Sequence, residues 1–212
     1  MKKNRTIATA ATALAAAILL AGCGTPEPEK TPTPSASATP TPTPTPEPGD
    51  AAPAQEKVDP PTSLDDALQA ANKTAQAYLV YNFDLLSNPA LGGDYLVNYA
   101  SDAALKSAED TSRVYLENGQ FVSGGPSTFE PNMGLSYATP ISDQSGQTWE
   151  NAEVILIGCG DNTAMKFEAE PGKTPQAVTS GRFAAQFDVM YYPNQGVWKV
   201  KKLSSPQGGP TC

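Results

Sequence analysis

Residues 183–203 read FAAQFDVMYYPNQGVWKVKKL, and this stretch decides the fold. Its first half has the two-residue period of a β-strand with one buried face. The apolar positions of that period are Phe183, Ala185, Phe187, Val189 and Tyr191. Residues 193–196, PNQG, are turn formers that make a tight connection into a second strand over residues 197–203. The stretch therefore predicts an antiparallel hairpin.

Three stretches upstream of the hairpin also have strand patterns. Residues 154–157, VILI, form a continuous apolar run, as expected of a strand covered on both faces. The other two stretches alternate, at Leu135, Tyr137, Thr139 and Ile141 and at Met165, Phe167 and Ala169. Together with the hairpin they predict an antiparallel sheet of about five strands.

Two long stretches with a helical period precede the strands. Ser63, with Asp66 three positions later, opens the first helix in the manner of a capping box. Apolar residues then recur at close to 3.6 positions: Leu64, Leu68, Ala71, Ala75, Tyr78, Leu79 and Phe83. This helix should end near Leu86, because the breaker Ser-Asn-Pro follows at residues 87–89.

A second long helix should run from Asp102 to about Glu117, with Ser101 as its cap and Asn-Gly at residues 118–119 as its end. Residues 94–99 have a short helical pattern between the two. Two to three N-terminal helices followed by antiparallel strands predict an α+β fold, with the helices packed on one face of a curved sheet.

Proline divides the chain into two parts. Of the 21 prolines, 12 fall between Gly24 and Pro61, a stretch without aromatic residues. Such a stretch cannot bury enough apolar surface to offset its ordering entropy, and alternating proline favours polyproline II. We predict a disordered Thr/Pro-rich stalk over residues 23–61 and one folded domain over residues 62–212. The stalk is interpreted as a spacer; a ligand for proline-binding domains and an O-glycosylated stalk are the alternatives.

The first 22 residues have the parts of a secretory signal peptide: a basic start, an apolar run over residues 7–20, and small residues after it. A transmembrane helix is the alternative, but a span needs about 20 apolar residues and this run is shorter. Residues 20–23, Leu-Ala-Gly-Cys, resemble a bacterial lipobox, in which the cysteine takes a diacylglycerol and the chain is cut just before it.

The lipobox resemblance implies a lipoprotein signal peptide over residues 1–22 and lipidation at Cys23. Two acyl chains, of the palmitate kind, give the paired signal that stable membrane anchoring requires. We therefore expect the protein on the extracytoplasmic side of the cell membrane, which it contacts through the lipid anchor.

With Cys23 acylated, Cys159 and Cys212 remain, an even number for an exported chain. We expect them to form a disulfide bond, which suits an oxidising exterior. A zinc site is the alternative, but the chain has no histidine and would have to complete the shell with carboxylates. No metal and no cofactor are therefore expected.

Charge argues against nucleic acid as a partner. Residues 62–212 carry nine basic and 16 acidic residues, which leaves a net charge of −7. Binding to nucleic acid depends on clustered Lys and Arg that release counterions from phosphates. The densest basic group is Lys199, Lys201 and Lys202, too small a cluster for that role.

The order of the predicted elements resembles the nuclear-transport-factor-2-like (NTF2-like, cystatin-like) fold, the α+β cone of ketosteroid isomerases and their relatives. Three features carry the resemblance: the paired N-terminal helices, the helix from Asp102 to Asn118 that runs straight into the sheet, and the closing strand GVWKV at residues 196–200. With the lipobox, the stalk and the cysteine pair, the whole chain is similar to secreted lipoproteins of high-GC Gram-positive bacteria, the actinobacterial type.

This resemblance implies a pocket between helices and sheet, where ketosteroid isomerases hold an Asp base beside a Tyr and a protonated Asp. The candidates for those roles are Tyr78, Tyr95, Tyr137 and Asp188. Core packing explains the same tyrosines, and alternation puts Asp188 on the opposite face of its strand from Phe187. Dehydratase relatives depend on histidine, which is absent from this chain.

Other motifs with a chemical function are incomplete. Residues 123–126, SGGP, lack the lysine of a phosphate-binding loop. Cys159 has no histidine that could act as its base. Asp161 and Asn162 are interpreted as turn formers, because their loop has too few oxygen donors for calcium.

The sequence therefore favours a non-catalytic, membrane-anchored module of the cell envelope that binds a protein partner or a small apolar ligand. An isomerase-type enzyme and a structural spacer are the alternatives. Aromatic residues on or near the predicted helices are numerous enough to line a pocket: Tyr78, Tyr81, Phe83, Tyr95, Tyr99 and Tyr115. Core packing explains them equally well, so the sequence assigns no ligand-binding residue.

Overall fold

The computed structural model describes residues 46–175 and 180–212. The signal peptide, Cys23 and the stalk as far as residue 45 lie outside the described residues, and their predicted roles stay predictions.

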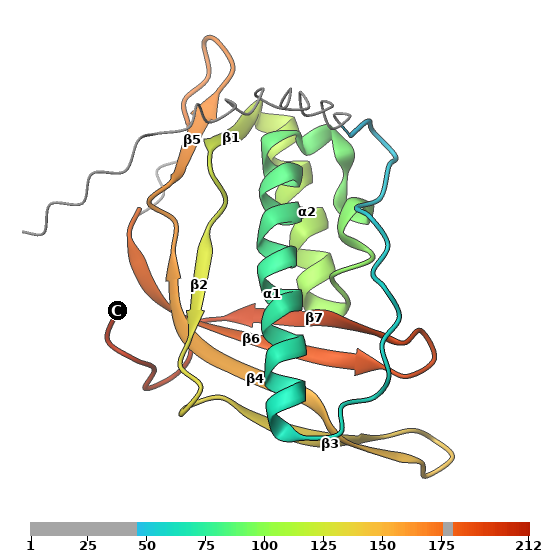
Figure 1. Cartoon of the computed structure of the whole chain (residues 1–212). Coiled ribbons are helices and arrows are strands. Elements are labelled where there is room, and N and C mark those ends of the chain that lie inside the picture. Colours follow the sequence, from blue (N-terminus) through green and yellow to red (C-terminus); the bar gives the residue numbers. More distant parts are fainter. Residues whose placement is uncertain (1–45, 176–179) are drawn as a thin grey trace, which may run out of the picture. The chain divides into compact units, whose positions relative to one another are not determined.

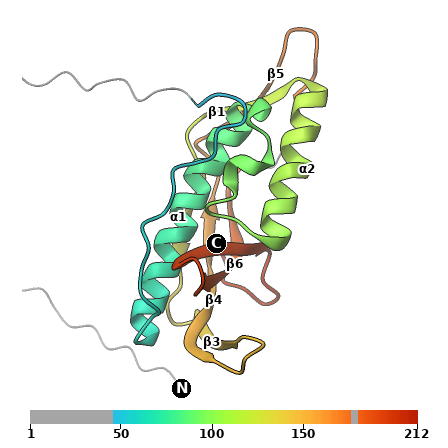
Figure 2. The same cartoon turned by 90° about the vertical axis from the view of Figure 1, so that its right-hand side faces the viewer.

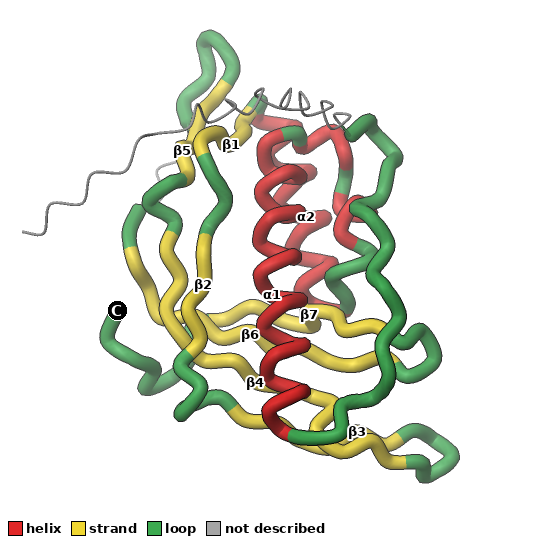
Figure 3. Tube along the Cα trace, viewed as in Figure 1, coloured by secondary structure: helices red, strands yellow, loops and turns green. Residues whose placement is uncertain are grey.

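Helices come first in the described chain and strands follow (Figure 1, Figure 3). The long helices are α1 (Leu64–Ser87) and α2 (Asp102–Asn118), and two short 3₁₀ turns, η1 (Pro89–Leu91) and η2 (Gly93–Leu96), lie between them. The strands are β1 (Gln120–Gly124), β2 (Thr128–Pro131), β3 (Tyr137–Ser142), β4 (Thr148–Asp161), β5 (Met165–Ala169), β6 (Arg182–Tyr192) and β7 (Val197–Ser204). The predicted α+β class, with helices packed on antiparallel strands, is confirmed.

The strands form two separate sheets. The larger has five strands in the order β2-β4-β6-β7, with β3 also paired to β4. The smaller is an antiparallel ribbon of β1 and β5, in which Val122 pairs with Phe167. The prediction of about five strands missed β1 and β2, because each has only four or five residues and glycine and proline lie between them. It also did not foresee that β5 leaves the main sheet to pair with β1.

The predicted hairpin is confirmed as β6 and β7. Gly196 closes the turn: its N–H donates to the carbonyl of Tyr192 at 2.8 Å, and its φ of +69° lies in the region that favours glycine. The apolar side chains Phe187, Val189 and Tyr191 face the core and are at most 2% exposed. The two-residue period therefore located the buried face of this strand correctly.

Strand β4 differs from the expectation in one respect. Val154 and Leu156 are fully buried, whereas Ile155 and Ile157 on the other face are only partly buried. The apolar run VILI is therefore covered by helices on one face and not on both.

Helix α1 begins and ends close to the predicted positions. The Ser63 hydroxyl accepts a hydrogen bond from the backbone N–H of Asp66 at 3.1 Å, which completes the expected cap. The buried face of the helix packs on the main sheet, where Tyr78 meets Phe187 edge-on with ring centroids 6.3 Å apart. Ring pairs of this kind add about 0.5–1.5 kcal/mol beyond the area that they bury.

The chain before α1 also belongs to the folded domain. We call residues 52–58 the strap; they have no regular secondary structure and run beside α1 (Figure 2, Figure 3). Ala52 is 1% exposed, and its N–H donates to the carbonyl of Tyr95 at 2.8 Å. Val58 N–H donates to Gly196 O at 2.8 Å. The predicted domain boundary at Thr62 is therefore too late, because backbone hydrogen bonds hold a segment that has almost no apolar pattern.

The expected disulfide is present. Cys159 in β4 and Cys212 are bonded, with their Cα atoms 5.7 Å apart and a sequence separation of 53. Closing a loop of this length contributes about 4 kcal/mol on the chain-entropy account. The bond holds the C-terminal residues to the face of the main sheet that α1 does not cover.

Within the described ranges, no helix combines the length and the apolar character that crossing a bilayer requires.

Candidate ligand pocket

A small apolar pocket lies between α1 and the main sheet, with a volume of about 160 Å³. Helix α1 provides one wall, and strands β2, β4, β5, β6 and β7 provide the others. Its lining residues are Leu79, Asn82, Leu86, Ser127, Thr128, Phe129, Gly160, Met165, Phe167, Phe183, Ala185, Phe187 and Leu203.

Local structure explains why these side chains meet. Leu79, Asn82 and Leu86 are three and four positions apart, which places them on one face of α1. On β6 the period of two sends Phe183, Ala185 and Phe187 to the same face. The helix and the strand therefore present one stripe each to the pocket.

The pocket has a buried floor and an open mouth. Phe187 is 1% exposed and packs against Phe129, with ring centroids 4.7 Å apart. At the mouth, Phe183 and Leu203 are 43% and 45% exposed. An apolar group can therefore enter past these two side chains without displacing the core.

Gly160 allows Phe183 to take its place at the mouth. A Cβ atom on Gly160 would lie 2.6 Å from the Phe183 ring, closer than side chains pack. The ring therefore lies directly on the β4 backbone, and any other residue at position 160 would push Phe183 away from the pocket wall.

The polar groups of the pocket are uncharged. Asn82, Ser127 and Thr128 are the polar side chains in the lining, and no carboxylate, lysine or tyrosine is among the lining residues. Within the described part of the chain, the Asn82 side-chain amide has no hydrogen-bond partner. A mostly apolar wall with a few uncharged polar groups suits the binding of an apolar ligand.

The four residues considered for isomerase chemistry are not brought together. Tyr78 lies in the core, where burial raises the pKa of its hydroxyl to about 12. Tyr137 is 49% exposed on β3. Asp188 is on the face of β6 opposite to Phe187, as predicted, and Gln186 Nε2 donates to its carboxylate at 2.7 Å. None of these residues lines the pocket.

Tyr95, the fourth candidate, has a carboxylate partner that the sequence did not indicate. Its hydroxyl donates to Asp84 Oδ2 at 3.4 Å. Burial raises the pKa of the Asp84 carboxyl, and the hydrogen bond from Tyr95 opposes this effect. Burial and the Asp84 carboxylate together raise the pKa of Tyr95 to about 12. Neither residue lines the pocket, so the pair has no access to a ligand bound there.

The aromatic residues expected on the helices do not line this pocket, although Tyr81 and Tyr99 line a separate cleft beside the strap. Tyr81 contacts Tyr99, with ring centroids 4.6 Å apart, and Tyr95 edge-on. Tyr115 belongs to a small second core cluster, with Phe83 packed against it. The pocket is lined instead by four phenylalanines of the strands: Phe129, Phe167, Phe183 and Phe187. The alternation of β5 and β6 contained these residues, but it did not show which face α1 would cover.

The turn after β4 matches its predicted role. Asp161 Oδ1 accepts a hydrogen bond from the N–H of Thr163 at 2.8 Å, and Asn162 Oδ1 accepts one from Gly181 N–H at 2.8 Å. The bonds to Thr163 lower the pKa of the Asp161 carboxyl. Among the described residues, no group of three or more His, Cys, Asp and Glu side chains is placed to hold a metal ion.

Comparison with known proteins identifies no family. No protein-family model matches the chain, and no curated protein does. Among solved structures, the chain is similar to the intermembrane space region of the chloroplast protein ARC6, at 10% sequence identity and a TM-score of 0.39. That match covers 64% of this chain and 93% of the other. A likeness at this level carries no inference about function.

Proposed function

We propose that the domain binds a small apolar ligand, without catalysis, in the pocket between α1 and the main sheet. The observation that carries this proposal is the pocket lining, which is apolar apart from three uncharged polar side chains. The isomerase alternative is less well supported, because it needs a carboxylate and a tyrosine hydroxyl at the ligand and the lining has neither.

The size of the pocket limits what can enter. A cavity of about 150 Å³ in another protein holds one benzene ring, and the pocket here has about 160 Å³. An aromatic ring or a chain of about six carbons therefore fits. At about 0.8 kcal/mol for each buried methylene, a six-carbon chain gains about 5 kcal/mol, which corresponds to a millimolar to submillimolar dissociation constant.

The mouth of the pocket favours a small ligand over a protein partner. Two large apolar side chains, Phe183 and Leu203, are exposed there. A stable protein interface buries about 800 Å² on each side, which is far more surface than two side chains provide. A partner could still insert one apolar side chain, so the proposal is tested with small probes first.

The predicted membrane anchor would locate this binding at the membrane surface. With a lipid at Cys23, the domain would stand at a membrane surface, where apolar molecules are concentrated. We also propose that the domain has the NTF2-like cone fold. The position of α1 over one face of the main sheet supports this fold.

Titration with 1-hexanol tests the proposal. At ten times the dissociation constant, bound hexanol should add about 1.4 kcal/mol of stability and raise the thermal midpoint. NMR shifts should be confined to the pocket, at methyl groups such as those of Leu79 and Met165.

Two variants with matched exposure locate the site. Leu203→Asp places a charge at the mouth and should abolish the hexanol effect, because an ionised carboxylate there disfavours apolar binding. Leu135→Asp should leave it unchanged, since Leu135 is 46% exposed and does not line the pocket. Equal hexanol binding by both variants would place the site elsewhere. No binding to the wild-type protein would leave the spacer function as the better explanation.

A further inference from the structure

A second, wider groove runs along α2 and shares a wall with the pocket. Its volume is about 660 Å³, and its lining is Ala103, Lys106, Ser107, Asp110, Thr111, Val114, Tyr115 and Phe167. Phe167 of β5 lines both the groove and the pocket. The Phe167 side chain therefore forms part of the wall of both the groove and the pocket.

The shared wall lies outside the main core. Phe167 is partly buried and packs against a small cluster made of Leu86, Tyr115, Val122 and Met165. It belongs to the β1–β5 ribbon, which is not paired to the main sheet and lies beside the C-terminal end of α1 (Figure 1). A change of the Phe167 rotamer would therefore disturb few packed neighbours, in contrast to a change at Phe187 in the main core.

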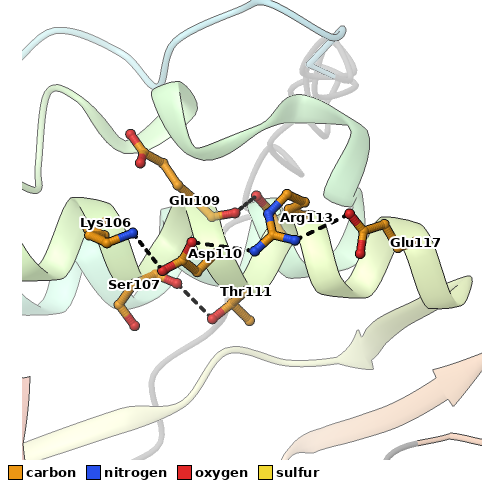
Figure 4. A network of polar contacts seen from close by, with 8 residues as sticks. Lys106, Ser107, Glu109, Asp110, Thr111, Arg113 and Glu117 are labelled. Carbon is orange, nitrogen blue, oxygen red and sulfur yellow. Dashed lines mark hydrogen bonds and ion pairs between the residues drawn. The ribbon is translucent and has the colours of Figure 1, made fainter.

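The polar rim of the groove is internally paired. Lys106 Nζ lies 2.9 Å from Asp110 Oδ2, and Arg113 lies 3.6 Å from the other oxygen of the same carboxylate (Figure 4). Thr111 Oγ1 donates to the carbonyl of Ser107 at 2.7 Å. Because the charges of the rim already have partners on the same helix, the groove presents hydroxyl groups and paired charges, which suits an uncharged polar group.

The shared wall at Phe167 and the volumes of the two spaces allow a ligand that uses both. Small-molecule sites usually occupy about 300–1,000 Å³, and the pocket alone, with about 160 Å³, is smaller than that. The α2 groove alone falls inside the usual range, and the pocket adds an enclosed apolar end to it. A molecule that fills both must be long and narrow where it passes Phe167.

We propose that the ligand is a single-chain amphiphile with an uncharged polar end. The apolar end of the ligand's alkyl chain occupies the pocket, the alkyl chain passes Phe167, and the polar end of the ligand lies at the rim of the α2 groove near Thr111. This inference rests on the proposed function, because it takes the pocket as the binding site, and it adds the chemical class of the ligand.

The inference is tested by varying the length of the ligand's alkyl chain. Burial of each methylene is worth about a fourfold gain in affinity. Wild-type protein should therefore bind 1-decanol at least about tenfold more tightly than 1-hexanol, even if only half of the four additional methylenes are buried. Both alcohols are used below their solubility limits, and binding is measured by calorimetry.

Two tryptophan variants on α2 separate the groove from non-specific adsorption. Thr111→Trp fills the groove and should remove the advantage of decanol while hexanol still binds as in the wild type. Leu116→Trp is the control, because Leu116 is 58% exposed on the same helix and does not line the groove. It should keep the tenfold difference.

The outcomes distinguish this inference from the proposed function. Failure of hexanol to bind the wild-type protein overturns the proposed function itself. Hexanol binding with no gain for decanol, or an equal loss of that gain in both tryptophan variants, overturns the inference alone. Decanoate provides the last comparison: binding as tight as that of decanol would contradict an uncharged polar end.

Discussion

Asp84 is a residue whose ionised form opposes folding. It lies in the last turns of α1, where burial raises the pKa of its carboxyl above the ordinary value of 3.8. The folded state therefore binds the proton more tightly than the unfolded state does. Stability falls as the pH rises from the unfolded value through the raised folded value, and the ionised carboxylate costs free energy at all higher pH.

The variant Asp84→Asn should be more stable than the wild type at pH 7. The amide oxygen can still accept the hydrogen bond of the Tyr95 hydroxyl, and the desolvated charge is gone. We expect a gain below about 1 kcal/mol, because water screens a partly exposed carboxylate. The gain should shrink as the pH falls through the raised pKa of Asp84, where the wild-type carboxyl takes up its proton. Urea unfolding at several pH values measures both effects.

Asp110→Asn is the control, because it should change the stability at pH 7 in the opposite direction. Hydrogen bonding and attraction from Lys106 lower the pKa of the Asp110 carboxyl, so its contribution to stability is present above 3.8 and is lost as the pH falls through the lowered value. This variant should lose stability at pH 7. A change of the same sign in both variants would contradict the role assigned to Asp84.

The strap is the element that holds the start of the domain in place. Gln55 Nε2 donates to the carbonyls of Asn98 and Trp198, at 2.5 and 2.6 Å. Val58 O accepts from the Tyr191 hydroxyl at 2.9 Å. The strap therefore links the turn before α2 to the β6–β7 hairpin, two parts of the chain that are about 100 positions apart in sequence.

Gln55→Ala should destabilise the domain by about 2 kcal/mol, because two hydrogen bonds are lost at about 1 kcal/mol each. Glu56→Ala is the matched control: Glu56 is exposed on the same segment and should change the free energy of unfolding by less than about 0.5 kcal/mol. The comparison is made by urea unfolding at pH 7. An equal effect of the two variants would show that the strap does not contribute through these bonds.

The elements differ in how far the sequence predicts them, and the reason is physical. Helices α1 and α2 and the β6–β7 hairpin carry periodic patterns bounded by cap or turn residues, and they were predicted within a residue or two. The expected cap of α2 is the exception, because the Ser101 hydroxyl bonds the Tyr192 hydroxyl and makes no capping bond. The strap carries no periodic pattern, because backbone hydrogen bonds and one glutamine hold it. Strands β1 and β2 are too short for a period to be visible.

The pocket was predictable only in its general position. Its phenylalanines come from β2, β5 and β6, and local alternation shows that Phe183 and Phe187 share a face. It does not show that α1 lies over that face, that β5 pairs with β1, or that Phe167 reaches two cavities. Those facts depend on contacts between segments far apart in sequence, and one sequence contains no direct signal of them.

On the scale of the whole molecule, the strap shortens the spacer between the domain and the predicted anchor. With residues 52–58 packed on the domain and a hydrogen-bonded turn at residues 47–50 before them, residues 24–46 remain for an extended stalk. In polyproline II geometry, at about 3.1 Å per residue, these 23 residues would reach about 70 Å, against about 120 Å for a stalk that extends to Pro61. The disulfide at Cys212 and the strap fasten both ends of the described chain to the same domain.

Lipidation at Cys23 is the prediction on which this arrangement at the membrane depends. In a Gram-positive host, wild-type protein should take up a palmitate analogue and sediment with membranes, because two acyl chains anchor stably. Cys23→Ser should abolish labelling and leave the protein uncleaved or released, since a hydroxyl is a far weaker nucleophile than a thiolate. Cys212→Ser is the control and should keep the label, because that sulfur is bonded to Cys159 and not to lipid. Labelling of the Cys23→Ser variant at the wild-type level would refute the anchor. The stalk would then join the domain to something other than the bilayer.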